Sequence, residues 1–216
     1  MTGGERTAAT PLPRGRHKLP REAVLASQRA RLLEAMSELV GRQGYEATTV
    51  PDVVAAARVS RNAFYDLFSD KTDCFIALCE DAGHELATEL VAFVNEGDWR
   101  VALREGLRTY LRWWQERPAL ARAYLVELPM AGPRAIVQRE RQYDRFGGVL
   151  QAVGQWARLD RTDLPELRSV SVRAAVISVT ELVAAQVREA GPDRLLELED
   201  DLYHLLVTLL AGPPAD

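Results

Sequence analysis

Apolar side chains recur every three or four residues along most of this 216-residue chain. That spacing is the period of an amphipathic α-helix. The first long example runs from about Glu22 to Arg42, and Gly44 follows it at a position that suits a helix C-cap. No stretch alternates apolar and polar residues with the period of two expected of a half-buried strand, and no segment repeats at a fixed interval. The pattern therefore predicts an all-α protein with about nine helices.

Two short helices joined by a tight turn follow within the segment TTVPDVVAAARVSRNAFYDLFSDK, which begins at Thr48. Thr49 is a suitable N-cap for the first helix, and Ser60 is a suitable N-cap for the second. The apolar residues of both helices fall on one side and are Val50, Val53, Val54, Ala57, Ala63, Phe64, Leu67 and Phe68. The other side of the second helix carries Arg61, Asn62, Tyr65 and Asp66. A polar second helix of this kind is what a helix-turn-helix presents to the DNA major groove.

Several residues of this segment resemble the N-terminal DNA-binding domain of TetR-family transcriptional regulators: Thr49, Ala55, Ala56, Ala57, Val59, Ser60, Phe64, Tyr65, Phe68 and Lys71. The resemblance spans roughly residues 27–82. It implies an N-terminal three-helix domain with a helix-turn-helix, followed by a C-terminal helical domain for ligand binding and dimerisation. The domain boundaries we expect are 1–21 for a flexible basic arm, 22–72 for the DNA-binding domain and 73–216 for the effector-binding and dimerisation domain.

Two residues depart from the family pattern. Arg58 stands where the family usually has a glycine between the two helices, so a non-glycine residue is expected near the left-handed region, with a strain of about 1 kcal/mol, or else a slightly different turn. Leu67 stands where a groove-facing polar or aromatic residue is common. The second departure puts one base contact in doubt.

Base readout is assigned first to Arg61 and Asn62. An arginine can donate two hydrogen bonds to guanine, an asparagine can pair with adenine, and Ala63 can contact a thymine methyl group. The family resemblance implies that Thr49, Tyr65 and Lys71 contact phosphates, and Ser60 completes the DNA-binding set. Outside such a motif, an Arg-Asn pair would be read as ordinary solvated surface.

The charge of the chain is unevenly distributed. The net charge is −4, yet residues 1–33 hold seven Lys or Arg against two acidic residues, whereas residues from 76 onward hold 16 basic and 22 acidic residues. Such asymmetry suits a protein that presents one end to phosphate. Arg14, Arg16 and Lys18 lie in the basic arm. They are interpreted either as an extension into an adjacent minor groove or as a solvated tail.

Aromatic residues gather on three successive helices of the second half: Tyr110, Trp113, Trp114, Tyr124, Tyr143, Phe146 and Trp156. Aromatic residues at helical spacing usually belong to a core. The family resemblance implies a ligand cavity in this domain, and we expect Tyr110, Trp114, Tyr124 and Phe146 to line it. A small apolar or aromatic effector would suit such walls.

The last two helices are expected from Pro165 to Ala190 and from Pro192 or Asp193 to Ala211. The first is apolar around most of its circumference, so it must be buried from several sides. Either both helices complete the core of one subunit, or they pair across a twofold axis in a four-helix bundle. The family resemblance favours a homodimer, with Ile177, Leu182, Val183, Leu202 and Leu206 at the interface.

Other classes of protein find little support. The apolar runs look too short and too interrupted to span a membrane, and Cys74 and Cys79 read as two buried thiols in a cytoplasmic protein. His17, His84 and His204 are far apart, and no phosphate-binding loop or nucleophile motif is present. We therefore expect no enzyme, no metal site, no cofactor and no membrane partner.

The function predicted from the sequence is that of a homodimeric repressor that binds a palindromic double-stranded DNA operator and is released by a small-molecule effector. Two alternatives remain open at this point. One is an activator that no ligand controls, and the other is a helical dimeric ligand-binding or scaffolding protein without DNA binding.

Overall fold

The computed structural model describes residues 20–94 and 97–211, and all regular structure in them is helical. The α-helices are α1 Arg21–Gln43, α2 Val50–Ala57, α3 Arg61–Leu67, α4 Lys71–Val91, α5 Trp99–Gln115, α6 Pro118–Ala121, α7 Pro133–Asp160, α8 Ser169–Ala190 and α9 Glu199–Ala211. A π-helix, η1 (Arg122–Glu127), and two 3-10 segments, η2 (Leu128–Met130) and η3 (Pro192–Leu198), complete the order. Across these described ranges the all-α prediction with nine α-helices is confirmed.

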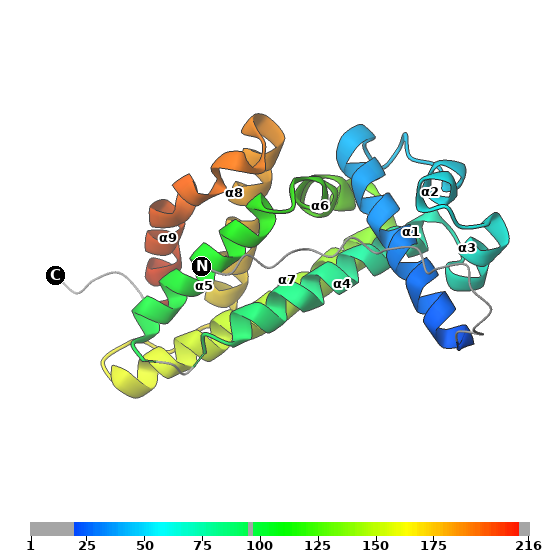
Figure 1. Cartoon of the computed structure of the whole chain (residues 1–216). Coiled ribbons are helices and arrows are strands. Elements are labelled where there is room, and N and C mark those ends of the chain that lie inside the picture. The colour runs from blue at the N-terminus through cyan, green and yellow to red at the C-terminus, as the bar shows by residue number, and fades with distance from the viewer. Residues whose placement is uncertain (1–19, 95–96, 212–216) are drawn as a thin grey trace, which may run out of the picture.

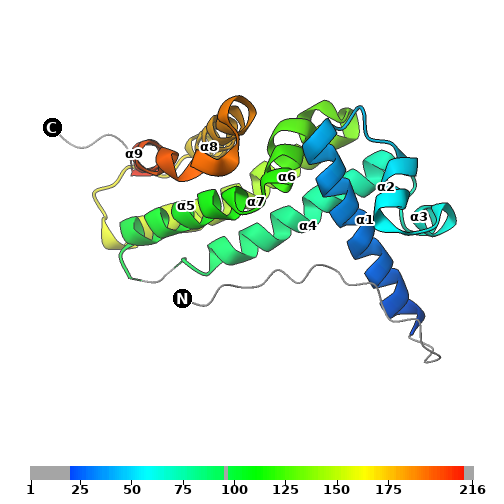
Figure 2. The same cartoon turned by 45° about the horizontal axis from the view of Figure 1, so that its top comes forward.

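The helices form two regions joined along α4 and α7. Helices α1, α2 and α3 make a head at one end, and α5, α8 and α9 gather at the opposite end (Figure 1). Helices α4 and α7 start near the head and run side by side toward that far end, as Figure 2 also shows. Helix α6 lies between α1 and the far helices, in contact with both α1 and α5. We call residues 20–70 the head and residues 71–211 the body.

The core of the head forms where apolar faces of its helices meet. Leu32, Met36 and Val40 of α1 are fully buried, and so is Phe64 of α3. The turn between α2 and α3 takes the conformation that the sequence suggested, because Arg58 has φ 53° and ψ 44° in the left-handed region. Arg31 of α1 steadies this turn, since its Nη1 donates to the carbonyl oxygens of Ala57 at 3.1 Å and Arg58 at 3.2 Å.

Three helix boundaries differ from the expected ones. Helix α8 begins at Ser169 rather than at Pro165, and the last expected helix is divided into η3 and α9, with the non-helical Arg194 (φ −115°) inside η3. The short helix expected to end near Leu128 consists of α6 followed by the π-helical turn η1. A π-turn accommodates one extra residue in a helix and cannot be recognised from apolar spacing alone.

Helix α8 is long and apolar enough, by length and composition, to cross a membrane. This finding differs from the expectation that every apolar run was too short. The core helix of a soluble protein meets the same criterion, and 39% of the most apolar stretch of α8 is buried in the body. The length and composition of α8 are therefore weak evidence for a membrane span. They fit equally well a helix with one buried face and one exposed apolar face.

Candidate nucleic-acid interface and ligand cavity

The two helices of the helix-turn-helix begin where the sequence placed their caps. Thr49 and Asp52 form a capping box, in which the Thr49 hydroxyl oxygen accepts from the Asp52 amide and an Asp52 carboxylate oxygen accepts from the Thr49 amide at 3.0 Å. The Thr49 hydroxyl also donates to the Asp52 carboxylate at 2.6 Å, and this bond together with the one from the Thr49 amide lowers the pKa of Asp52. Ser60 caps α3 by accepting from the Ala63 amide at 3.1 Å. Because both caps depend on residues three positions apart, short-range sequence suffices to fix them.

The outward side of α3 carries the residues assigned to base readout. Arg61, Asn62, Tyr65 and Asp66 are exposed, while Phe64 is fully buried beneath them. The Arg61 guanidinium lies 5.7 Å from the centroid of the Tyr65 ring, within the range of a cation-π contact. Helix α3 lies on the outer side of the head, away from the body (Figure 1). Nothing in the described part of the chain covers this face.

Lys71 lies differently from the expected phosphate contact. Its ammonium donates to the carbonyl oxygens of Tyr45 at 2.8 Å and Thr48 at 2.9 Å, and it lies 4.0 Å from the centroid of the Tyr45 ring. Burial lowers the pKa of Lys71. Because two of its three N–H donors are used within the protein, Lys71 primarily holds the α1–α2 loop that leads into Thr49.

Leu67 and the basic arm were also considered as possible DNA contacts. Leu67 is half-buried and packs against the core of the head, so it leaves the groove-facing surface to its neighbours. Arg14, Arg16 and Lys18 lie outside the described residues.

An apolar cavity of about 80 Å³ lies inside the body, among α4, α5, α7, α8 and α9. Only Tyr110 and Thr180 bring hydroxyl groups to its wall; the rest is hydrocarbon, aromatic or glycine: Leu90, Phe93, Ala102, Leu103, Gly106, Leu107, Phe146, Val149, Leu150, Val153, Val176, Val179 and Leu206. A water molecule needs roughly 10–15 Å³ by this measure, so the space would hold several waters or a slender apolar ligand. We call it the apolar cavity.

A second hollow, of about 10 Å³, adjoins the apolar cavity and shares Tyr110, Phe146 and Thr180 with it. Its other lining residues are Tyr124, Leu125, Leu128, Arg139, Gln142 and Tyr143. Burial raises the pKa of Tyr110 to about 12 and holds the pKa of Tyr124 well above its usual range. We call this hollow the polar chamber.

The four residues expected to line a cavity divide between these spaces. Tyr110 and Phe146 line both, and Tyr124 lines only the polar chamber. Trp114 lines neither. It is fully buried behind them, with its ring centroid 6.2 Å from that of Tyr110 and 4.7 Å from that of Tyr124. The aliphatic wall had no signal in the sequence, because its residues come from five helices and look like ordinary core positions.

The head and body meet at a closely packed joint. Gly41 of α1 lies so near α6 that a Cβ atom there would stand 2.5 Å from the carbonyl oxygen of Ala119. Glu127, at the end of the π-helix, accepts from the Tyr45 amide at 2.9 Å. On the other side, Arg134 at the start of α7 donates to Asp70 at 2.7 Å. We call these three contacts the joint.

The residues assigned to a dimer interface also divide. Val183, Leu202 and Leu206 are 0%, 1% and 3% exposed, so they lie in the core of a single subunit. Burial in their own subunit removes these three from any surface that a second copy could touch. Ile177 is half-buried and Leu182 is 48% exposed, so these two remain accessible on α8.

Both cysteines are free and buried, as the sequence suggested. Burial raises the pKa of the Cys74 thiol to about 12 and raises that of Cys79 further. Thiols held in the protonated form are poor nucleophiles, so these residues act as core side chains.

Comparison with known proteins agrees with this architecture. Residues 32–78 match the family model described as bacterial regulatory proteins, tetR family. No curated protein sequence matches the chain. Among solved structures, the fatty acid degradation regulator FadR from Bacillus halodurans is similar, with 14% identity and a TM-score of 0.73 over 88% of this chain and 97% of that one.

Two further structures share the fold over most of their length. FadR from Bacillus subtilis in complex with stearoyl-CoA has 12% identity and a TM-score of 0.69, covering 85% of this chain and 98% of that one. The TetR-family regulator PfmR from Thermus thermophilus has 22% identity and a TM-score of 0.65, covering 87% of this chain and 98% of that one. Residues 32–78 are therefore similar to the TetR-family model, and the chain that carries them has the helical fold of these solved regulators.

Proposed function

We propose that this protein is a homodimeric transcriptional repressor, whose grip on a palindromic operator is released when a small molecule enters the body. The observation that carries the proposal is the uncovered outer face of α3, where Arg61, Asn62 and Tyr65 are exposed on a helix whose start is fixed by Ser60. This arrangement is what major-groove readout requires of a recognition helix.

Specific contacts follow from the chemistry of these side chains. Arg61 would donate to guanine and Asn62 would pair with adenine, while the Tyr65 hydroxyl and Thr49 would contact phosphates. Ser60 and Ala63 would bring the helix N-terminus close to the bases. Lys71 would contribute through the loop that it holds, because its ammonium already has two carbonyl partners. The arm with Arg14, Arg16 and Lys18 stays assigned to the adjacent minor groove or to solvent.

A second copy of the chain would pack on the exposed face of α8. Ala174, Ile177, Ser178, Leu182 and Ala185 fall on one side of that helix and are all at least partly accessible. Small residues alternating with larger apolar ones permit close helix packing across a twofold axis. This surface replaces the earlier assignment of Val183, Leu202 and Leu206. The proposed domains keep their limits, with the arm at 1–21, the DNA-binding domain at 22–72 and the effector and dimerisation domain at 73–216.

A small apolar effector is supported by the apolar cavity and by the bound ligand of a protein with the same fold, FadR from Bacillus subtilis in complex with stearoyl-CoA. The effector must bind the conformation that cannot grip DNA more tightly than the one that can, by about 1–3 kcal/mol for a typical coupling. The joint offers the route, since Gly41, Tyr45 and Asp70 of the head all touch the body there.

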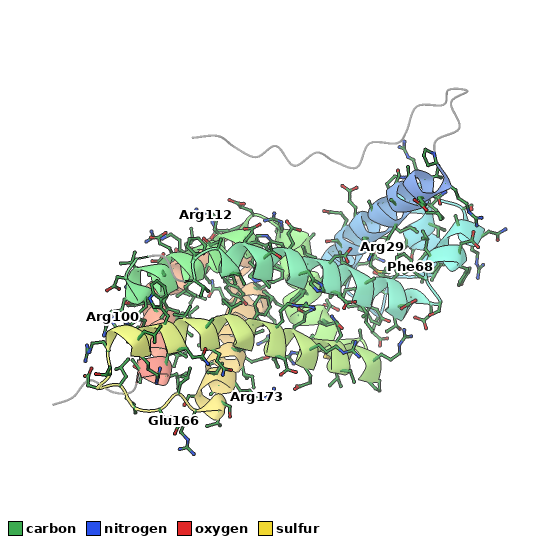
Figure 3. The ribbon with its side chains drawn as sticks, turned by 90° about the horizontal axis from the view of Figure 1, so that it is seen from below. Arg29, Phe68, Arg100, Arg112, Glu166 and Arg173 are labelled. Carbon is green, nitrogen blue, oxygen red and sulfur yellow. The ribbon has the colours of Figure 1, made fainter. Side chains whose placement is uncertain are left out.

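The test measures binding to DNA taken from the region flanking the protein's own gene, by gel shift and fluorescence anisotropy. Arg61→Ala should weaken specific binding by about 1–3 kcal/mol and relax preference at one base pair of each half-site. The matched control is Arg112→Ala, because Arg112 is also exposed but lies on the body, far from Phe68 of the head (Figure 3).

Unchanged sequence preference in Arg61→Ala would refute the assignment of the recognition face. Binding to no DNA at all, with the dimer intact, would favour the alternative of a helical ligand-binding or scaffolding protein. An operator complex that no ligand dissociates would favour an activator or a repressor without an effector.

A further inference from the structure

The two hollows of the body differ sharply in chemistry although they touch. Tyr110, Phe146 and Thr180 line both hollows, so the two hollows lie next to each other. The apolar cavity has no charged lining residue, whereas the polar chamber is lined by Arg139, Gln142 and three tyrosines. Together they form a space with a hydrocarbon end and a hydrogen-bonding end.

One hydroxyl in the polar chamber lacks a partner. Tyr124 is 6% exposed, and its hydroxyl makes no hydrogen bond to any of the described residues. Tyr110 and Tyr143 line the same hollow as Tyr124. Buried polar side-chain atoms in native proteins nearly always have a partner, so an unpartnered one at the wall of a hollow points to something that binds there.

Three other polar side chains of the chamber have partners within the protein. Arg139 forms an ion pair with Glu181, and its guanidinium lies 5.3 Å from the centroid of the Tyr143 ring. Gln142 donates to the carbonyl oxygen of Cys79 at 3.3 Å and accepts from Arg145 at 2.7 Å. The Tyr143 hydroxyl donates to Glu181 at 3.4 Å. Among the described residues that line the chamber, the Tyr124 hydroxyl is thus the fully buried polar group without a partner, and its proton needs an acceptor.

The state of this proton is fixed by burial. Because burial holds the pKa of Tyr124 well above its usual range, the phenol stays protonated and neutral across the physiological pH range. A neutral hydroxyl donor can bind either a carbonyl oxygen or a carboxylate oxygen.

We infer that the polar chamber holds the polar end of the effector. The effector would be a molecule with a hydrocarbon chain in the apolar cavity and a small terminal oxygen acceptor that accepts a hydrogen bond from the Tyr124 hydroxyl. This inference rests on the proposed effector-controlled function and specifies the class of ligand. A chamber of about 10 Å³ accepts a carboxyl or ester oxygen and excludes a bulky polar group such as a nucleotide. The ligand would therefore lie with its polar end in the polar chamber and its hydrocarbon chain in the apolar cavity.

Tyr124 would also link the bound ligand to residues 20–70, the head of the protein. Tyr124 lies within the π-helix η1, and Glu127 at the end of the same six-residue element accepts from the Tyr45 amide. A hydrogen bond to Tyr124 would act directly on the element that contacts the α1–α2 loop. Single π-helical turns often occur at functional sites.

The test uses four probes on the full-length protein without DNA: decanoic acid, its methyl ester, decane and decanoyl-CoA. Binding is followed by isothermal titration and by tryptophan fluorescence, since Trp114 packs against Tyr124. We expect the acid and the ester to bind more tightly than decane, and decanoyl-CoA to bind worst. Comparing the affinity of the methyl ester with that of the acid shows whether the site prefers a neutral or an anionic oxygen acceptor.

Tyr124→Phe should weaken the acid or the ester about ten-fold, the worth of one hydrogen bond, and leave decane unchanged. Tyr203→Phe is the matched control, because Tyr203 is a half-buried tyrosine of the body that lines neither hollow. Ligand-free Tyr124→Phe should unfold at the same temperature as the unaltered protein or higher, since an unpartnered hydroxyl is removed. If this variant folds poorly, Thr180→Val removes the hydroxyl of the shared wall and should give a smaller loss in the same direction.

Three results would overturn the inference: no binding by any probe, equal binding of the acid and ester by the unaltered protein and Tyr124→Phe, or tighter binding of decanoyl-CoA than of the acid. A crystal structure of the complex in which only a water molecule lies beside Tyr124, and the polar end of the ligand lies elsewhere, would also overturn it. Since no DNA is present, such a failure leaves the DNA-binding proposal standing, and the Arg61→Ala experiment judges that proposal separately.

Discussion

The head and the body satisfy their polar groups in different ways. Six buried side-chain polar atoms have no hydrogen-bond partner among the described residues, and five of them are in the body, on Trp113, Trp114, Tyr124 and Gln138. The single one in the head is Nε of Arg31, whose Nη1 already bonds two carbonyl oxygens. Most of the buried polar atoms without a partner are thus in the body, and one of them, the Tyr124 hydroxyl, lies at the wall of the polar chamber.

This contrast suits the two proposed tasks, DNA readout by the head and ligand binding by the body. A surface that reads DNA must hold its side chains in one geometry, and the caps of α2 and α3 provide that rigidity. A region that binds a ligand needs polar groups whose hydrogen-bond partners are supplied by the ligand. It must also have a second conformation of similar free energy. Three variant pairs can break or sharpen this comparison.

The largest effect is expected from charges placed on the two faces of the last helices. Leu206→Glu puts a carboxylate where only 3% of the side chain is exposed, and should destabilise the subunit by about 3 kcal/mol or more. Leu182→Glu alters a residue that is 48% exposed, so the subunit should stay folded while the dimer dissociates. Urea unfolding and sedimentation would measure the two outcomes. A folded dimer in Leu182→Glu would refute the α8 interface.

The next effect concerns the contact of α1 with α6. Gly41→Ala adds a Cβ atom 2.5 Å from the carbonyl oxygen of Ala119, and separating the two backbones should cost about 1–3 kcal/mol. Gly148→Ala is the control, because a Cβ atom there meets nothing within 4 Å and should stabilise α7 by about 0.5–1 kcal/mol. Thermal unfolding would compare them. Equal stability of both variants would show that α1 and α6 can separate freely.

The smallest effect is expected at the hydrogen bond between Glu127 and Tyr45. Glu127→Gln keeps an acceptor but removes its charge, so this bond should weaken by about 1 kcal/mol and the effect of ligand on operator affinity should shrink. Anisotropy titrations with and without ligand measure that coupling. Glu105→Gln, which alters only an exposed pair with Arg108 in the body, should leave it unchanged.

The sequence predicted local features better than long-range ones. The caps at Thr49 and Ser60 and the left-handed Arg58 were predictable because each depends on residues a few positions away. The carbonyl partners of Lys71 come from residues 23 and 26 positions earlier, which no local pattern reveals. Helical periodicity identified α8 as apolar all round, yet it could not tell that Val183 faces the core while Leu182 faces outward.

The cavity was the hardest feature to predict, because a hollow is defined by what its walls fail to fill. Of the four aromatic residues chosen, Trp114 lies behind the wall, and most of the lining is aliphatic. Aliphatic side chains around a cavity have the same spacing as those in a solid core, so only the three-dimensional arrangement distinguishes them.

The π-helical turn η1 has a consequence for how this protein can change over evolution. Each residue in an α-helix advances the direction of its side chains by about 100°. A π-turn therefore behaves like a one-residue insertion that the chain has absorbed without breaking the helix. Removing one residue between Arg122 and Tyr124 would restore regular α-helical phase and turn Glu127 away from the Tyr45 amide. We therefore expect the loss of a single codon at this site to break the hydrogen bond between the body and the α1–α2 loop.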